Sequence, residues 1–175
     1  MITLGVLTLS DKGSRGERVD ESGNVIVEML SPIGATVVRR EVLPDEKDLI
    51  AGKLRKWADS GEVDLIVTTG GTGLSPRDVT PEATLSVVDR VVPGLPEMMR
   101  AEGARKTPMS MLSRAVSGLR GRCLIINLPG SPKAVREDLE AISPVLCHAV
   151  EIMRGEAGEC ASRTDLAGPR PHHAH

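Results

Sequence analysis

Aromatic residues are almost absent from this chain of 175 residues, which has one tryptophan and neither tyrosine nor phenylalanine. Proteins that bind single-stranded nucleic acid stack its bases on aromatic rings, and this chain has no such platform. A basic excess is missing too, because 24 acidic residues outnumber 22 basic ones and give a formal net charge of −2. General nucleic-acid binders are usually strongly basic. Both absences argue against nucleic acid as a partner and leave the core to aliphatic residues.

Cysteines and long apolar runs are also scarce. Cys123, Cys147 and Cys160 are an odd number without a C-x-x-C pair, which disfavours a disulfide framework or a zinc knuckle and indicates a reducing compartment. The apolar runs are far shorter than the roughly 18 residues of a membrane span, and the start of the chain lacks the basic region of a signal peptide. We therefore expect a soluble, cytoplasmic protein with no membrane partner.

Short apolar runs alternate with amphipathic segments, which is typical of an α/β fold with a mostly parallel central sheet covered by helices. We predict strands at 2–9, 35–43, 63–69 and 122–128, and a polar loop at 10–22. We predict helices at 23–30, 46–59, 80–89, 94–104 and 131–154, with Thr80 as the N-cap of the third and Pro144 interrupting or restarting the last. Residues 1–154 then form one domain. Residues 155–175 lose the pattern and, despite three terminal histidines, are expected to be a disordered tail.

Three loops directly follow predicted strands, at 10–14, 69–73 and 127–133. Ligands of an open parallel sheet bind outside the carboxyl ends of its strands, so these loops are expected to form one crevice. The second loop reads T-G-G-T-G, and glycines let successive N–H groups converge on an anion. The loop is neither a Walker A nor a G-x-G-x-x-G motif. A plain turn is the alternative, but a position after a central strand favours an anion site.

Asp11 and Asp45 stand at the carboxyl ends of the first two predicted strands, and Asp78 lies five residues past the T-G-G-T-G loop. Carboxylates beside a phosphate cradle are the usual setting for Mg²⁺. For Asp45, ordinary helix capping explains the sequence equally well. Lys133 lies in the first turn of a predicted helix, where the helix dipole disfavours a cation, so we expect it to face a phosphate.

Positive charge gathers between residues 100 and 122, which hold six basic residues and one acidic residue. A solvated face is the ordinary explanation, and a local field that attracts polyanions is the alternative. Hydrolase chemistry is disfavoured because no Ser-His-Asp arrangement is apparent.

Six sequence blocks appear in order along the chain. They are S-D-K-G-S at 10–14, L-P-D-E at 43–46, T-T-G-G-T-G-x-x-x-R-D-V-T-P-E-A-T at 68–84, P-G-L-P-E-M-M-R at 93–100, M-L-S-R at 111–114 and N-L-P-G-S-P-K at 127–133. Together they resemble the molybdopterin adenylyltransferases of molybdenum-cofactor biosynthesis, of the MogA and MoaB type, to which the G domain of gephyrin-type proteins is related. The resemblance runs from residue 2 to about residue 154, and the third block is its most specific part.

This resemblance implies a Rossmann-like three-layer α/β/α sandwich, usually assembled as a homotrimer, with pairing into hexamers left open. It implies transfer of AMP from Mg-ATP to the terminal phosphate of molybdopterin, a pterin dithiolene, with release of pyrophosphate and hand-over to a molybdenum insertase. Asp45 and Asp78 match the two aspartates tied to catalysis and Mg²⁺. Substrate-binding positions of the family are matched by Asp11, Thr69, Gly70, Gly71, Thr72, Gly73, Ser113, Asn127, Pro129, Gly130, Ser131 and Lys133.

Two other functions compete with this interpretation. A catalytically inactive molybdopterin-binding or scaffold protein would have the same fold, and the presence of both aspartates favours the enzyme. A different phosphoryl-transfer enzyme with a G-G-x-G loop, such as a sugar kinase, would not need the full set of blocks.

Overall fold

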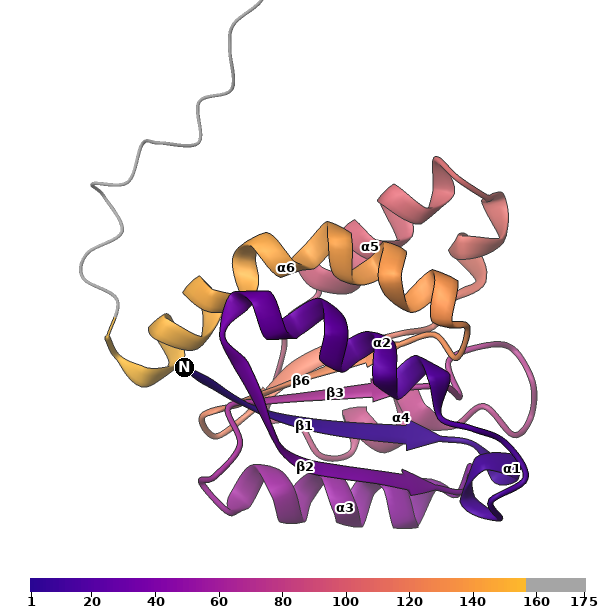
Figure 1. Ribbon diagram of the computed structural model, residues 1–175, viewed down its shortest axis with the longest axis horizontal. Helices are drawn as coiled ribbons and strands as arrows, with labels where there is room; N and C mark the ends of the chain where they lie inside the picture. The colour runs from indigo at the N-terminus through magenta and orange to yellow at the C-terminus, as the bar shows by residue number, and fades with distance from the viewer. Residues whose placement is uncertain (157–175) are drawn as a thin grey trace, which may run out of the picture.

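A six-stranded sheet forms the middle layer of the computed structural model, which describes residues 1–156 (Figure 1). The strands are β1 (Ile2–Leu9), β2 (Ala35–Leu43), β3 (Leu65–Thr69), β4 (Arg90–Val91), β5 (Ser117–Arg120) and β6 (Cys123–Leu128), in the order β2-β1-β3-β6-β5-β4. Strands β2, β1, β3 and β6 are parallel, and β5 and β4 extend the sheet in antiparallel pairing. All residues of β3 are buried, as expected of a central parallel strand.

Helices cover both faces of this sheet. They are α1 (Asp11–Ser14), α2 (Glu21–Leu30), α3 (Lys47–Asp59), α4 (Thr80–Leu85), α5 (Gly94–Ala104) and α6 (Pro132–Arg154), with short 3₁₀ turns η1 (Ser31–Ile33) and η2 (Pro108–Leu112). Helices α2, α5 and α6 share one core cluster, and α3 and α4 share the other (Figure 1). The three-layer α/β/α prediction is thus confirmed. None of the helices in the described range is long and apolar enough to cross a membrane.

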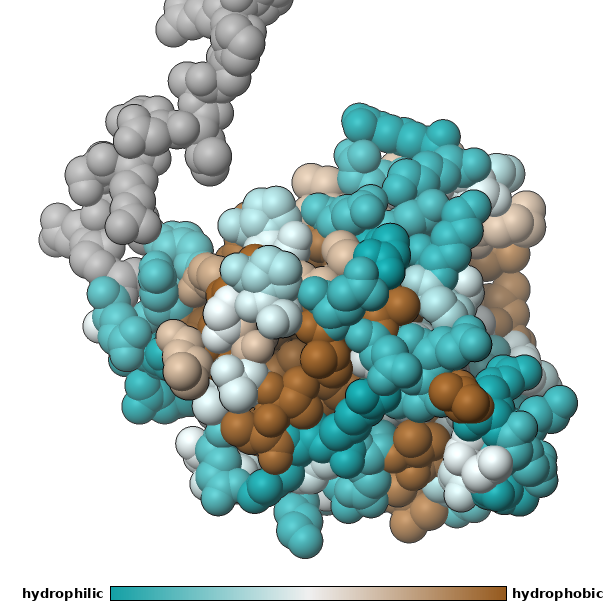
Figure 2. Space-filling model, in the orientation of Figure 1, coloured by the Kyte–Doolittle hydropathy of each residue, from teal (hydrophilic) through white to brown (hydrophobic). Residues whose placement is uncertain are grey.

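The two core clusters follow from the alternation of side chains along the strands. On β3, Leu65 and Val67 pack toward α2 and α6, whereas Ile66 between them packs toward α3. The edge strand β2 has a neighbour on one side only, and its side chains are mostly half-buried. Figure 2 accordingly shows apolar surface between α2 and β2.

Several predicted elements need correction. The helix that starts at Thr80 ends at Leu85 and not near residue 89, and the chain then enters β4. The antiparallel strands β4 and β5 were not predicted, because two and four residues are too few to show a period. The loop predicted at 10–22 contains the helical turn α1, and α2 begins earlier than predicted because Asp20 caps it.

Helix α6 runs unbroken through Pro144, contrary to the predicted interruption. Its buried residues are Val135, Leu139, Ile142, Leu146 and Val150, which form one stripe on both sides of the proline. This continuous packing holds the two halves in line although Pro144 cannot donate a helical hydrogen bond. The helix ends at Gly155, which has a left-handed backbone (φ 74°), and the rest of the predicted tail lies outside the described residues.

Candidate active site

The loops that follow β3 and β6 meet at the carboxyl edge of the sheet, whereas the loop after β1, expected in the same crevice, contributes no residue to the cavity described below. Thr69 Oγ1 donates a hydrogen bond to the carbonyl oxygen of Pro129 at 2.6 Å, and Gly70 N–H donates to Leu128 at 3.1 Å. A Cβ atom added to Gly130 would lie 3.5 Å from Cα of Gly70. The T-G-G-T-G loop and the N-L-P-G-S-P-K loop are therefore in direct contact.

Two consecutive glycines give the T-G-G-T-G loop its shape. Gly70 and Gly71 have φ angles of 99° and 66°, in the left-handed region that side-chain-bearing residues rarely adopt. A Cβ atom at Gly70 would lie 2.3 Å from the backbone oxygen of Leu9, and one at Gly71 would lie 2.3 Å from Thr80 Oγ1. Both positions therefore require glycine, because conformation and space each exclude a side chain.

The carbonyl oxygens of residues 70–73 all accept hydrogen bonds, whereas three of the four backbone N–H groups of these residues donate to none of the described residues. The carbonyl oxygens of Gly70 and Gly71 accept from Thr80, the first from its Oγ1 and the second from its backbone N–H. Those of Thr72 and Gly73 accept from Arg114, the first from its backbone N–H and the second from its Nε. The backbone N–H groups of Gly71, Thr72 and Gly73 donate to no residue within 1–156. Three successive donors without an acceptor suit an oxyanion such as a phosphate.

The role of Thr80 differs from the prediction. Val79 is the N-cap of α4, and the Thr80 side chain caps nothing. Its hydroxyl is buried and donates to Gly70 O at 2.9 Å, so it holds the glycine turn against the start of α4.

A cavity of about 510 Å³ opens beside these donors. It is lined by parts of three regions: the T-G-G-T-G loop with Asp78, the α5–η2 segment, and the start of α6. Of the residues expected to bind substrate or metal, the cavity wall includes Gly71, Thr72, Gly73, Asp78, Ser113, Pro129, Gly130 and Ser131.

The other expected residues do not line this cavity. Asn127 is fully buried, with its amide donating to Thr68 and Thr84 and its oxygen accepting from Val116 N–H, so it supports the loops from within the core. Thr69 and Gly70 are buried behind the loop. Lys133 is exposed on the first turn of α6.

Asp78 and Asp45 both lie close to the glycine loop, Asp78 at Gly73 and Asp45 at Gly71. Asp78 accepts a hydrogen bond from Ser75 N–H at 3.0 Å, and its Oδ2 is 2.8 Å from where a Cβ of Gly73 would be. Asp45 Oδ1 would lie 3.1 Å from a Cβ atom added to Gly71. The capping alternative for Asp45 does not hold, because the N-cap of α3 is Glu46 and no side chain caps that helix.

Asp11 and Asp45 are linked by reciprocal hydrogen bonds, each accepting from the backbone N–H of the other at 3.0–3.1 Å. Arg77 binds both carboxylate oxygens of Asp11, which lowers the pKa of Asp11. Burial raises the pKa of the Asp45 carboxyl, and the negative charges of Asp11 and Asp78 raise it further. Negative charge is therefore crowded at Asp45, and a bound cation would relieve it.

The residues at this edge fit Mg²⁺ only together with a substrate. Within residues 1–156 no group of three histidine, cysteine or acidic side chains gathers closely enough to hold a metal ion. Mg²⁺ is commonly bound through one or two carboxylates plus substrate phosphates and water. Asp45 and Asp78, beside a loop of free N–H donors, are suited to binding Mg²⁺ together with substrate phosphates.

Arg114 is a functional candidate that the sequence interpretation missed. It bonds the carbonyls of Thr72 and Gly73, donates to Asp78 O at 2.6 Å, and pairs with Glu82. The sequence placed it in a basic run 36 residues after Asp78, and only the fold brings the two together. Arg114 thus fixes both the glycine loop and the backbone of Asp78.

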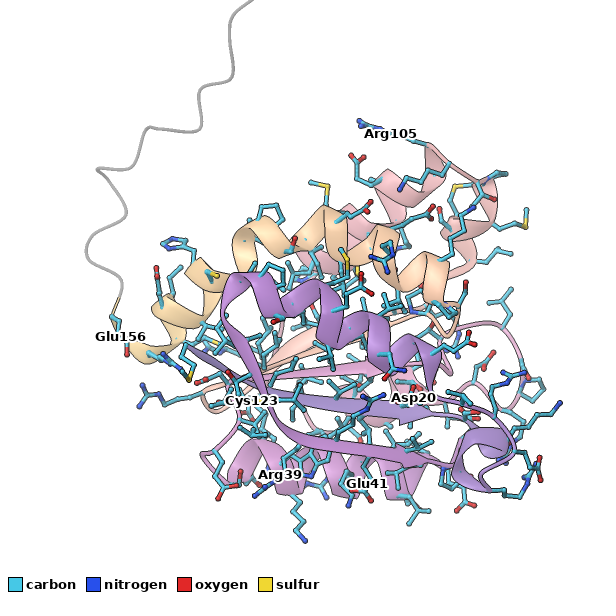
Figure 3. All side chains as sticks on the ribbon, in the orientation of Figure 1. Asp20, Arg39, Glu41, Arg105, Cys123 and Glu156 are labelled. Atoms are coloured by element: carbon cyan, nitrogen blue, oxygen red, sulfur yellow. The ribbon has the colours of Figure 1, made fainter. Side chains whose placement is uncertain are left out.

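Replacing Arg114 with methionine is expected to lower the rate of the reaction at least tenfold and to destabilise the fold by about 2 kcal/mol, because it leaves carbonyls and Glu82 without a partner. Arg105→Met is the matched control: the Arg105 side chain is 77% exposed, and within residues 1–156 it pairs only with Glu102 beside it. Figure 3 shows Arg105 at the outer end of the α5 region, pointing away from the molecule. Urea unfolding and turnover of both variants, measured below the unfolding range, check this prediction. Equal effects of the two substitutions would contradict it.

The basic segment as a whole has structural contacts. Arg105, Lys106, Arg114 and Arg120 pair with carboxylates, and Arg100 and Arg122 donate to backbone carbonyls. The polyanion-attracting field considered from the sequence has no support in this arrangement.

Asp138 is a second residue that the sequence interpretation missed. It lies in the second turn of α6 and lines the cavity together with Glu137. Burial, and then the charge of Glu137, raise the pKa of the Asp138 carboxyl to about 6. No pattern in the sequence distinguishes this aspartate from a solvated helix residue.

Comparison with known proteins decides the family. Residues 5–148 match a family model described as a probable molybdopterin binding domain. The chain belongs to the molybdopterin-binding family. A relative in this family, the molybdopterin adenylyltransferase of Helicobacter pylori, is 44% identical over 156 residues, which cover 88% of this chain and 89% of the relative. The Escherichia coli enzyme of the same name is 39% identical and covers 81% of this chain and 73% of its own length.

Solved structures of the molybdopterin-binding family have the same fold. The MoaB enzyme of molybdopterin biosynthesis from Thermus thermophilus superposes with a TM-score of 0.83 at 56% identity, covering 89% of this chain and 98% of that one. A tungsten cofactor synthesizing protein, MoaB from Pyrococcus furiosus, superposes with a TM-score of 0.79 at 36% identity and covers 88% and 98% of the two chains. The resemblance seen in the six sequence blocks is confirmed.

Proposed function

We propose that this protein is a molybdopterin adenylyltransferase that transfers AMP from ATP to the terminal phosphate of molybdopterin. The observation that carries the proposal is the row of three unpaired N–H donors at residues 71–73, beside Asp78 in a cavity of about 510 Å³. Relatives that bear this activity in their name match nearly the whole described chain. A binding protein without catalysis would need the donors but not the two flanking aspartates.

In the proposed step an oxygen of the molybdopterin phosphate attacks the α-phosphorus of ATP. One P–O bond forms, the bond from the α-phosphorus to the bridging oxygen breaks, and pyrophosphate leaves with the electron pair. Little covalent help is needed for phosphoryl-type transfer, so positioning and charge neutralisation dominate. The N–H groups of Gly71, Thr72 and Gly73 hold the attacking phosphate, with Ser131 and Gly130 on the facing loop.

Asp45 and Asp78 would hold Mg²⁺ together with the phosphates of ATP. When bound, the ion supplies charge neutralisation of the triphosphate and polarisation of its α-phosphoryl group. Asp45 lies outside the cavity wall, on the side of the loop where Asp11 and Arg77 form their ion pair. We propose that molybdopterin occupies the cavity and that ATP binds toward Asp45, so that its α-phosphorus reaches the molybdopterin phosphate at the glycine loop.

The remaining expectations are part of the same proposal. We infer a cytoplasmic homotrimer, with pairing to a hexamer left open, because the resemblance implies such assembly and ATP is a cytoplasmic substrate. The resemblance also implies hand-over of the adenylylated pterin to a molybdenum insertase, which we include in the proposal. Asn127, Thr69 and Gly70 are proposed to support the loops, since their polar atoms bond to the protein. The role of Lys133, exposed beside the cavity, is proposed as attraction of the phosphate.

Pyrophosphate release tests this function. Purified protein with ATP, Mg²⁺ and molybdopterin should release pyrophosphate, and dephosphorylated molybdopterin should give none because it lacks the attacking oxygen. Binding of molybdopterin without any release of pyrophosphate would support a scaffold instead. Release of ADP would indicate a kinase.

A further inference from the structure

Part of the cavity wall comes from outside the glycine loop. This part is formed by α5, η2 and the first turns of α6, and includes Met99, Met109 and Leu112 along with Glu137 and Asp138. Apolar side chains beside two adjacent acids, of which Glu137 already pairs with Lys106, suit a flat ring that carries hydrogen-bond donors on one edge. They do not suit a second phosphate.

Asp138 lacks a hydrogen-bond or ion-pair partner in the described part of the chain. Its carboxylate makes no hydrogen bond or ion pair with any residue from 1 to 156. The nearby cations are bonded elsewhere: Arg100 donates to the carbonyls of Ser113 and Ala115, and Lys106 lies 3.7 Å from both Glu137 and Glu140. A half-buried carboxylate without a partner costs free energy in the empty protein, so a ligand is the natural source of its hydrogen bonds.

We propose that Asp138 recognises the pterin ring of molybdopterin, its two carboxylate oxygens accepting from the ring N–H and the adjacent exocyclic amine. This inference rests on the proposed function for the identity of the ligand. The pterin edge presents two neighbouring N–H donors. They can form two parallel hydrogen bonds with one carboxylate, as the guanidinium of an arginine does. The adenine edge of ATP offers one donor beside one acceptor and fits poorly.

The same carboxylate excludes related rings. A lumazine differs from a pterin in carrying an oxygen where the pterin has its amine. That oxygen and the Asp138 carboxylate would both be acceptors, so no hydrogen bond would form between them. Leaving a buried polar group without its partner discriminates strongly between two ligands. Asp138 therefore determines specificity at the ring end, whereas the glycine loop binds the phosphate end.

Fluorescence titration with 6-hydroxymethylpterin and 6-hydroxymethyllumazine tests the proposal without ATP. The wild-type protein should bind the pterin at least about tenfold more tightly than the lumazine at pH 7.5. Asp138→Asn should reduce that ratio below about threefold, because its amide can no longer accept two hydrogen bonds. Glu137→Gln, which removes a charge from the adjacent position on the same wall, should preserve the ratio.

Stability separates recognition from a structural role. Because the folded state favours protonated Asp138, with a pKa of about 6 against 3.8 for a free carboxyl, its ionisation destabilises the protein progressively as the pH rises through 6. Asp138→Asn should therefore raise Tm more at pH 7.5 than at pH 5 while it weakens pterin discrimination. Arg100, Lys106 and Glu137 are the charged groups around it and are unchanged in this variant.

Three outcomes would overturn the proposal: an unchanged pterin-to-lumazine ratio in Asp138→Asn, an equal loss in Glu137→Gln, or a lower Tm in Asp138→Asn at pH 7.5. Guanosine has the same pair of edge donors, and tighter binding of guanosine than of the pterin would assign this end to a nucleotide. Pterin discrimination in a protein that releases no pyrophosphate would leave this inference standing while the proposed catalysis fails.

Discussion

Replacing Asp78 with asparagine is expected to lower molybdopterin-dependent pyrophosphate release at least about 100-fold, corresponding to about 3 kcal/mol of transition-state stabilisation. The substitution keeps the shape of the side chain and an oxygen that can accept from Ser75 N–H, a bond of 3.0 Å in the wild type. It removes the charge that would bind Mg²⁺. Molybdopterin binding should survive, because the phosphate is held by backbone donors and the loss of an acid eases the approach of an anion. Turnover at saturating substrates and a binding titration on the same samples give the two quantities.

Asp48→Asn is the matched control for this experiment, since it makes the same chemical change at an exposed position of α3. It should leave turnover within about twofold of wild type, as surface substitutions away from special features usually do. Asp45→Asn should also reduce turnover strongly, because it removes the second charge proposed to bind Mg²⁺ while an oxygen remains to accept from Asp11 N–H. Normal turnover of Asp78→Asn would refute the metal-binding role.

Replacing Gly70 with alanine is expected to destabilise the protein by about 3 kcal/mol or more, which lowers Tm by roughly 10 °C for a chain of this size. The reason is a combination of a φ angle of 99° and a Cβ atom only 2.3 Å from the Leu9 backbone oxygen. Leu9 ends β1, so relief of the clash must move either the strand or the loop. Activity should fall with stability, because the free N–H groups of the next three residues depend on this turn.

Gly52→Ala provides the contrasting variant. Gly52 lies in α3 with nothing within 4 Å of an added Cβ and an ordinary helical backbone, so the substitution should stabilise the protein by about 0.5–1 kcal/mol. Thermal unfolding of both variants gives the comparison. A Gly70→Ala protein as stable as wild type would show that the loop can rearrange to accommodate a side chain. It would contradict the claim that position 70 requires glycine.

The parts of the site that sequence could predict are those written in consecutive residues. The T-G-G-T-G loop after an apolar strand, and Ser131 followed by Pro132 at the start of α6, both specify local backbone geometry, and the structure places them as expected. The meeting of the loops after β3 and β6 followed from the rule that parallel strands end at the same edge. Local conformation and the position of the site at the sheet edge therefore follow from the residues of each segment.

The parts that could not be predicted depend on contacts between distant segments. Arg114 reads as one charge in a basic run, and Asn127 reads as a loop residue at the end of a strand. The fold turns the first toward the glycine loop and buries the second between Thr68 and Thr84. Asp138 stands out only when the cavity is known and when the nearby cations, Arg100 and Lys106, are seen to bond elsewhere. Hydrogen bonds of this kind carry no local period, so a single sequence does not reveal them.

Transfer of label from the α-phosphate of ATP to the pterin tests the central claim most directly. ATP labelled at the α-phosphorus is incubated with Mg²⁺, molybdopterin and the purified protein, and the pterin product is separated and counted. Adenylyl transfer predicts one labelled adenylyl group per molybdopterin, with unlabelled pyrophosphate released in equal amount. The yield at a fixed early time should be reduced about 100-fold in Asp78→Asn. A pterin product that carries label only when the γ-phosphorus is labelled, or no labelled product from a protein that binds molybdopterin, would contradict it.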